Sequence, residues 1–489
     1  MNLTKFLENG GSACARTDIL SDVIRYSPDP SKPGCDAAYA SFRAATTPSF
    51  TCDCQGDHAY LGGSGGLRSG TVFTLSNIIG TILVAITAPS LGTWIDHNGG
   101  KRVWIALITT AGLCMIGMAV LGPSYVWMVG LVISVITIWA SELVTIPRQS
   151  YLIDILDPSA TDEAAHEACR TRVSGNRIIT SYLSQIIFVV VALVLTVALS
   201  LSTTLSSQII TALAGVWYLG HFAHLVPKFP PRAATRALSG RSFCSVAYGQ
   251  LWTDLKTIAV SYPQAHKYLI FLFIMQNGCA TTALSIAVSF CLEQFGLSGF
   301  QTQVIFVITL IFGPFWIKLM HLIMTKSKFS YKRLLLAVLI IWIVAIFMIG
   351  VVVNNMGRID GQFNAGFAVF LATSALLIAP GLTWYYSLYW PAYQSMVPKA
   401  QVNQFAGIFT MVRTIGLIPQ PLVYVACANG FSSASGGRQA GILLMIAWNL
   451  LAIPFLLWID FDKGKADAEK ADGIELTDGI DAAKSASAA

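Results

Sequence analysis

The chain has 489 residues, of which 54% are hydrophobic and only 11% are charged, and its formal net charge is +6. This composition excludes a soluble protein of this length and indicates an integral membrane protein. Most of the excess Lys and Arg lies in loops between apolar runs, where it orients the chain and contacts anionic lipid, so we expect no nucleic-acid partner.

The N-terminal region, residues 1–70, is polar and contains no apolar run long enough to cross a bilayer. We expect it to lie on the lumenal or extracellular side, where its cysteines could form one or two disulfides. Moving so many residues across a membrane normally requires a preceding helix. We therefore expect a first helix to be missing from the sequence as written, and an eleven-span chain with an outside N-terminus is the alternative. The cysteines are Cys14, Cys35, Cys52 and Cys54.

A short charged turn follows the first apolar run and orients the rest of the chain. Lys101 and Arg102 mark this turn as cytoplasmic by the positive-inside rule. Gly92 allows close helix packing, and Gly99 supplies a backbone turn that larger residues resist. Asp96 falls near a helix terminus, where it can pair with a cation. We predict that these five residues form a gating hinge.

The pattern Gly-x-x-x-Asp-x-x-Gly-x-Lys-Arg resembles the signature of the major facilitator superfamily, found in the loop between its second and third helices. The resemblance implies an all-α polytopic membrane protein built from two six-helix bundles. It also implies that two bundles rock about a central solute site.

Eleven apolar runs of spanning length follow one another at regular intervals. We predict membrane-spanning helices over 72–94, 103–121, 126–146, 178–199, 208–226, 267–291, 303–325, 334–353, 365–389, 405–427 and 439–458.

Loop composition divides these spans into domains. The basic segment 227–266 is predicted to be a central cytoplasmic loop between an N-terminal bundle at 71–226 and a C-terminal bundle at 267–458. Tyr331-Lys332-Arg333 occupies the place where the second half would repeat the hinge. Residues 459–489 become charged and Ala-rich and are predicted to form a disordered cytoplasmic tail.

Several short motifs are similar to those of the autophagy-related vacuolar amino-acid effluxer family. That resemblance implies release of amino acids from the vacuole or lysosome to the cytosol, and residence in that membrane. The motifs are Gln149-Ser150-Tyr151-Leu152, Arg172-Val173-Ser174-Gly175, Gln276-Asn277-Gly278, Val397-Pro398, the run Gln404-Phe405-Ala406-Gly407-Ile408-Phe409, and Arg413.

Two ionisable residues fall inside predicted spans, where a charge needs a partner or a role. Glu142 could carry a proton or bind a substrate ammonium, and a structural pair with Arg148 or Arg177 is the alternative. Arg413 could hold a substrate carboxylate bidentately, but we favour a latch onto Asp96 that closes the cytoplasmic side.

Polar and aromatic side chains in two further spans are candidate substrate contacts. Gln276 and Asn277 precede a glycine at which the helix is expected to loosen, as in the discontinuous helices of transporters. Trp384 and Tyr385 belong to an aromatic group that could close over a substrate, and an interfacial aromatic belt is the alternative.

Other features indicate neither a metal site nor an enzyme. His221 and His224 share a helical face but lack acidic or cysteine neighbours, so we expect interfacial histidines, no metal and no cofactor. Lys318 and His321 are expected to reach the cytoplasmic surface.

The sequence therefore predicts a transporter of small solutes, most simply an amino-acid effluxer, with protons as a candidate coupling ion. The alternatives are a proton-coupled carrier of sugars or other small organic solutes, and a non-transporting membrane sensor on the same fold.

Overall fold

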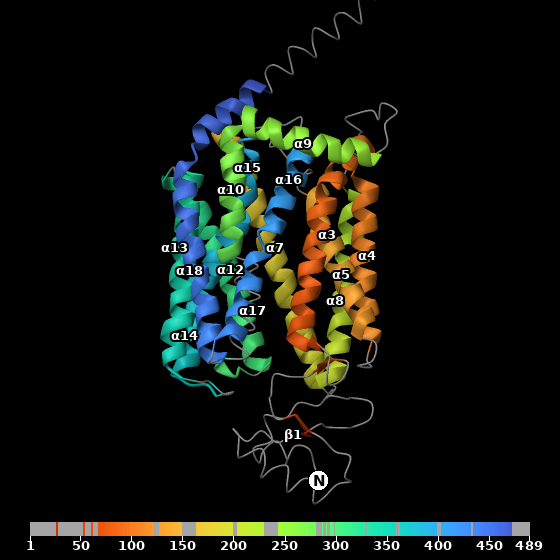
Figure 1. Ribbon diagram of the computed structural model, residues 1–489, viewed down its shortest axis with the longest axis vertical. Helices are drawn as coiled ribbons and strands as arrows, with labels where there is room; N and C mark the ends of the chain where they lie inside the picture. Colours follow the sequence, from red (N-terminus) through yellow and green to blue (C-terminus); the bar gives the residue numbers. More distant parts are fainter. Residues whose placement is uncertain are drawn as a thin grey trace, which may run out of the picture. The chain divides into compact units, whose positions relative to one another are not determined.

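A computed structural model gives the arrangement of the helices (Figure 1). The structure describes residues 26–27, 52–53, 60–61, 67–98, 100–121, 127–148, 163–198, 203–228, 243–279, 286, 290, 294–297, 299–327, 330–357, 359, 362–398, 402–431 and 434–471.

Helices account for nearly all of the described residues. They are α3 (Ser69–Asn98), α4 (Lys101–Val120), α5 (Trp127–Leu143), α7 (Glu163–Ala198), α8 (Thr203–Leu225), the 3-10 turn η3 (Val226–Lys228), α9 (Phe243–Ser261), α10 (Pro263–Gly278), α12 (Gly299–Ser327), α13 (Tyr331–Phe347), the π-helix η4 (Met348–Val353), α14 (Ala365–Thr373), the π-helix η5 (Ser374–Ile378), α15 (Ala379–Gln394), α16 (Val402–Ile415), α17 (Pro419–Gly430) and α18 (Ala434–Trp458).

The strands are short, two residues each. β1 (Tyr26–Ser27) pairs in parallel with β2 (Cys52–Asp53). β3 (Tyr60–Leu61) pairs antiparallel with β4 (Leu67–Arg68).

The prediction of an all-α polytopic membrane protein is confirmed. Within the described residues, 10 helical stretches are long and apolar enough to cross a membrane, and each coincides with a predicted span. The remaining predicted span, 267–291, begins with α10, and residues 280–285 after it lie outside the described part.

The chain forms two compact units. The first contains the described residues of Met1–Gly80, Thr109–Trp139 and Leu199–Gly220. Inside it, α4 and α8 approach closely at small residues, because a Cβ on Gly215 would lie 2.7 Å from the Gly112 carbonyl oxygen.

The second unit contains the described residues of Thr81–Ile108, Ala140–Ala198 and His221–Ala489. Its core lies where α18 packs against α10 and α13, and where α15 packs against α7, α12 and α13 (Figure 1). The predicted boundary between two bundles at 227–266 stays a prediction, and that segment contains the helix α9.

Two helices extend further than hydropathy predicted. α3 continues through Gly92 to Asn98 and α4 begins at Lys101, so most of the predicted hinge is helical. α7 begins at Glu163 instead of residue 178, so the stretch from Arg172 to Gly175 is helical rather than a loop. Its first turns are rich in Ala and Glu, which favour a helix without favouring a membrane.

Helix breaks occur where the sequence carries glycine, proline or buried amides. α10 ends at Gly278, as the Gln276-Asn277-Gly278 motif predicted. The predicted span 405–427 is divided into α16 and α17 by a turn at residues 416–418, directly before Pro419.

The chain also stays helical beyond the predicted end of its membrane-spanning part, over residues 461–471. The prediction of a disordered tail is therefore wrong for residues 461–471, and residues 472–489 lie outside the described part of the chain. Lys332 donates to the carbonyl oxygens of Leu457 and Ile459 at 2.7 and 2.9 Å and caps the end of α18. Phe461 is buried, with its ring centroid 6.0 Å from that of Tyr268.

This docking predicts a difference between two phenylalanines. We expect Phe461→Ala to lower the free energy of unfolding by about 3 kcal/mol, because it leaves a cavity among aromatic rings. Phe431→Ala removes an equal side chain that is 54% exposed and should change stability little. Thermal unfolding in detergent measures both, and equal melting temperatures for the two variants would show that residues 461–471 do not stabilise the fold.

Candidate functional site

An ion pair between two membrane-embedded helices forms the centre of the candidate site. Arg413 on α16 donates through Nη2 to Oε2 of Glu142 on α5. The Arg413 side chain is 6% exposed, whereas that of Glu142 is 31% exposed. Because a charge at this depth needs a partner, the pair explains how Arg413 is tolerated. Glu142 is therefore the more accessible member of the pair.

The partner of Arg413 differs from the one we favoured from the sequence. We expected a latch from Arg413 to Asp96, and Arg148 or Arg177 as the structural alternative for Glu142. The structure instead pairs Glu142 and Arg413 with each other, although they lie 271 residues apart. The side chain of Asp96 lies outside the described part of the chain, so its role in a gate stays a prediction.

A second arginine approaches from α7. The Arg177 side chain interacts with the Tyr389 side chain and lies close enough to Arg413 for the two cations to repel each other. Tyr389 also faces Arg413. Its ring stacks on that of Tyr385, with centroids 5.0 Å apart and planes inclined by 10°. We call Glu142, Arg177, Arg413, Tyr385 and Tyr389 the charged cluster.

Two buried hydroxyl groups at this cluster have no hydrogen-bond partner within the described residues, those of Tyr385 and Thr410. Tyr385 precedes Tyr389 by four residues, and Thr410 precedes Arg413 by three. Each hydroxyl-bearing residue therefore shares a helix face with a member of the cluster. Because an unpaired buried hydroxyl is unfavourable, both are candidates to bind a ligand or water.

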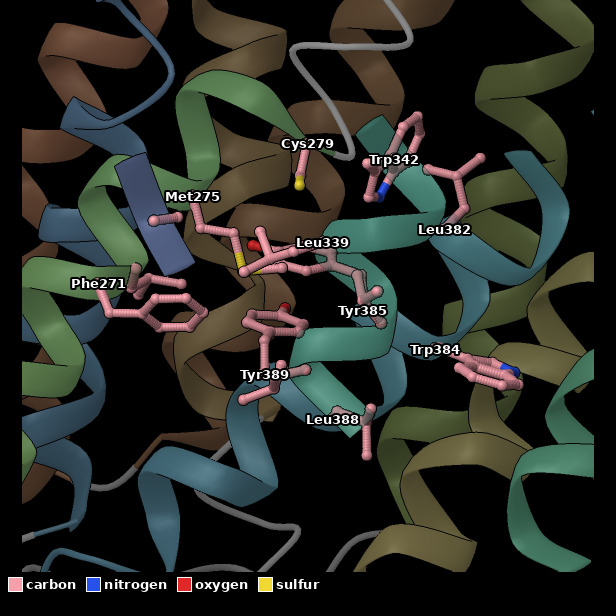
Figure 2. Close-up of a cluster of buried hydrophobic side chains, with 14 of the residues drawn as sticks. Phe271, Met275, Cys279, Leu339, Trp342, Leu382, Trp384, Tyr385, Leu388 and Tyr389 are labelled. Atoms are coloured by element: carbon pink, nitrogen blue, oxygen red, sulfur yellow. The ribbon is translucent and has the colours of Figure 1, made fainter. Parts of the chain in front are cut away.

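The two faces of α15 have different partners. Figure 2 shows Tyr385 and Tyr389 extending toward Met275 of α10, while Trp384 points away on the opposite side of the helix. The Trp384 indole N–H donates to the Trp316 carbonyl oxygen at 2.9 Å. Trp384 thereby holds α15 against α12, and its predicted contact with substrate stays a prediction.

The two predicted amides lie at a helix break. The Asn277 side chain donates to the Phe273 carbonyl oxygen at 2.9 Å and accepts from the Gln420 backbone N–H at 3.2 Å. Gln276 is buried on the same helix beside Gly416. Asn277 therefore supplies a hydrogen bond to the first turn of α17, where Pro419 interrupts the backbone pattern.

The predicted gating hinge is only partly described. Gly92 is buried within α3, Arg102 is exposed, and Gly99 lies outside the described residues. Lys101 donates to the Pro227 carbonyl oxygen at 3.2 Å and so ties the start of α4 to the turn after α8.

In the described part of the chain, no three His, Cys, Asp or Glu side chains gather closely enough to hold a metal ion. Two cluster residues, Arg177 and Tyr389, were not among the site residues assigned from the sequence. A signal was available, because Arg177 is a charge directly before the apolar part of α7. The predicted start of that span at residue 178 left it one residue outside.

Solved structures with the same arrangement of helices are membrane transporters. The human organic anion transporter MFSD10 (TETRAN) is 14% identical, with 78% of this chain and 83% of that chain covered and a TM-score of 0.53. The proton:xylose symporter XylE is 15% identical, with 82% and 89% covered and a TM-score of 0.57. These likenesses show that the chain has the fold of those transporters, and its apolar helices make it a multi-pass membrane protein.

The sequence comparison narrows this class to a family. The family described as vacuole effluxer Atg22 like matches residues 37–469, and the chain belongs to it. No curated protein matches the chain by sequence.

The ion pair predicts a non-additive response to substitution. Glu142→Gln leaves Arg413 buried without its counter-charge and should lower the free energy of unfolding by about 3–5 kcal/mol. The double variant E142Q/R413Q removes both charges and should recover much of that loss.

Thermal unfolding in detergent measures the four members of this cycle. Glu469→Gln, which neutralises an exposed carboxylate, is the matched control and should be silent. If E142Q melts like E469Q, or if the two single effects simply add, the pair does not stabilise the structure.

Proposed function

We propose that this protein moves amino acids across the vacuolar or lysosomal membrane to the cytosol by alternating access, without catalysing a chemical reaction. The observation that carries the proposal is the charged cluster, which presents both signs of charge and buried hydroxyl groups on membrane-embedded helices. An amino acid carries both signs of charge as well, so it can satisfy both kinds of group within one site.

The family description as a vacuole effluxer supports the direction and the membrane. The fold supports a small solute, since the similar structures belong to carriers of organic anions and of xylose. None of those solutes transfers directly, because the similarity is confined to the fold.

The ion pair is a contact that can be formed in one state of the transporter and broken in the other. Glu142 lies near the predicted cytoplasmic end of its span, and its link to Arg413 holds α5 against α16. Gly407 on α16 adds a close backbone approach, because a Cβ there would lie 3.0 Å from the Ala88 carbonyl oxygen of α3. These contacts keep the cytoplasmic side closed until the pair separates, and the Asp96 hinge stabilises one of the two states.

Counterflow in liposomes tests the function. Vesicles containing the purified protein are loaded with an excess of unlabelled neutral amino acids, basic amino acids or sugars, and entry of the labelled solute is followed. We expect transient accumulation with one amino-acid class and none in protein-free vesicles.

The outcome separates the alternatives. Accumulation with sugars alone would replace the proposal with a sugar carrier. Silence with every solute, in protein that unfolds cooperatively, would favour a sensor. Repeating the assay with an imposed pH gradient identifies protons as the coupling ion if the rate depends on it.

A further inference from the structure

We propose that Arg177 binds the carboxylate of the transported solute, with the Tyr385 hydroxyl as a second donor. The inference rests on the proposed function and deepens it, because it makes a carboxylate the group that every substrate must carry.

The first argument is charge. The cluster brings together two guanidinium groups, Arg177 and Arg413, and one carboxylate, Glu142. That carboxylate is already paired with Arg413. In the described part of the chain, the interactions of Arg177 are attraction to Tyr389 and repulsion from Arg413. The cluster therefore holds one positive charge more than it neutralises, which is unfavourable inside a bilayer and favours an anionic ligand.

The second argument is access and geometry. Arg177 is densely surrounded by protein atoms but keeps part of its surface exposed. A guanidinium has five N–H donors in a planar fork, and one tyrosine hydroxyl leaves most of them unused. The fork matches a carboxylate bidentately, whereas an uncharged solute offers it no equivalent partner.

The third argument is the unpaired hydroxyl beside it. The Tyr385 side chain is fully buried, and its hydroxyl has no hydrogen-bond partner among the described residues. Its ring stacks directly on that of Tyr389, whose side chain interacts with Arg177. The Tyr385 side chain also lies near Arg413, so its hydroxyl belongs to the same charged cluster, where a bound carboxylate would supply the missing acceptor.

The aromatic surroundings indicate a suitable probe. The Tyr389 ring also stacks on Phe409, with centroids 5.6 Å apart, and Phe409 contacts Trp390 edge to face at 5.0 Å. A solute with a large apolar side chain complements such walls. We therefore choose L-phenylalanine, its decarboxylated amine 2-phenylethylamine and its deaminated acid 3-phenylpropionate as probes.

Binding of the three probes to the full-length protein in detergent is measured by isothermal titration. We expect L-phenylalanine and 3-phenylpropionate to bind and 2-phenylethylamine not to bind. Arg177→Gln should weaken binding of both carboxylates about 10–100-fold, the loss expected for a hydrogen-bonded charge contact. Arg172→Gln removes an exposed charge from the same helix and should leave binding unchanged.

Two further variants distinguish a role of Arg177 in binding the ligand from a role in positioning Tyr389. Tyr389→Phe removes the hydroxyl that Arg177 contacts but keeps the ring, so it should weaken binding less than R177Q. Arg177→Lys keeps the charge without the fork and should recover part of the affinity. Because wild-type protein alone distinguishes the three probes, the inference remains testable if R177Q does not fold.

The inference is overturned if the amine binds as well as the amino acid, if R177Q and R172Q bind the carboxylates equally, or if no carboxylate binds to wild-type protein. Any of these results together with amino-acid counterflow removes the role of Arg177 and leaves the proposed function intact. Absence of amino-acid counterflow removes the proposed function itself.

Discussion

The arrangement of the site depends on the electrostatic cost of placing charges in a bilayer. Arg413 cannot occupy its buried position on α16 without an anion, and Glu142 on α5 supplies one. Because these residues lie 271 positions apart, in the two halves of the sequence, their pairing brings α5 and α16 together. Glu142 is the more exposed partner, so separation of the pair removes less packing around the carboxylate than around the guanidinium. In the proposed alternating-access cycle, that asymmetry would suit an interaction that breaks and re-forms.

The backbone breaks beside this pair follow from the same constraint. A helix that ends inside a membrane exposes N–H and C=O groups which lipid cannot bind, so other protein groups must do so. Asn277 provides such a group beside the turn between α16 and α17, because its side-chain oxygen accepts from the Gln420 backbone N–H. Gln420 donates to the Gly441 carbonyl oxygen at 2.8 Å, and Asn449 donates to that of Gly278 at 2.8 Å. Arg413 lies in the last turn before the break, so the amides that stabilise the break also position the arginine.

Hydropathy predicted the membrane-spanning part well, because length and apolarity are what a bilayer requires of a helix. It could not predict where helices continue into water. The start of α7 is polar and was predicted to be a loop, which left Arg177 at the edge of a span. Residues 461–471 look like a disordered tail by composition. Yet Phe461, Gly464 and Ala468 recur at helical spacing, and all three are buried.

Depth in a span also could not identify the partner of Arg413. Asp96 and Glu142 were both acids near the predicted cytoplasmic ends of their spans, and the choice between them depends on how helices pack. Asp96 was favoured because an acidic hinge and a cation would together form a two-state gate. The structure instead gives Arg413 the acid that lies within a span, where neutralising a charge matters most.

The aromatic run on α15 explains how one helix can serve both packing and a polar site. Neighbouring positions on a helix face different directions, so Trp384 and Tyr385 cannot both line the same surface. The Trp384 indole N–H donates a hydrogen bond to the backbone of α12. Tyr385 and Tyr389, four residues apart, share the other face and stack. Phenylalanine would pack equally well there, but only the phenol places a hydroxyl beside a guanidinium. The choice of tyrosine at these positions is therefore explained by the charged cluster and not by packing.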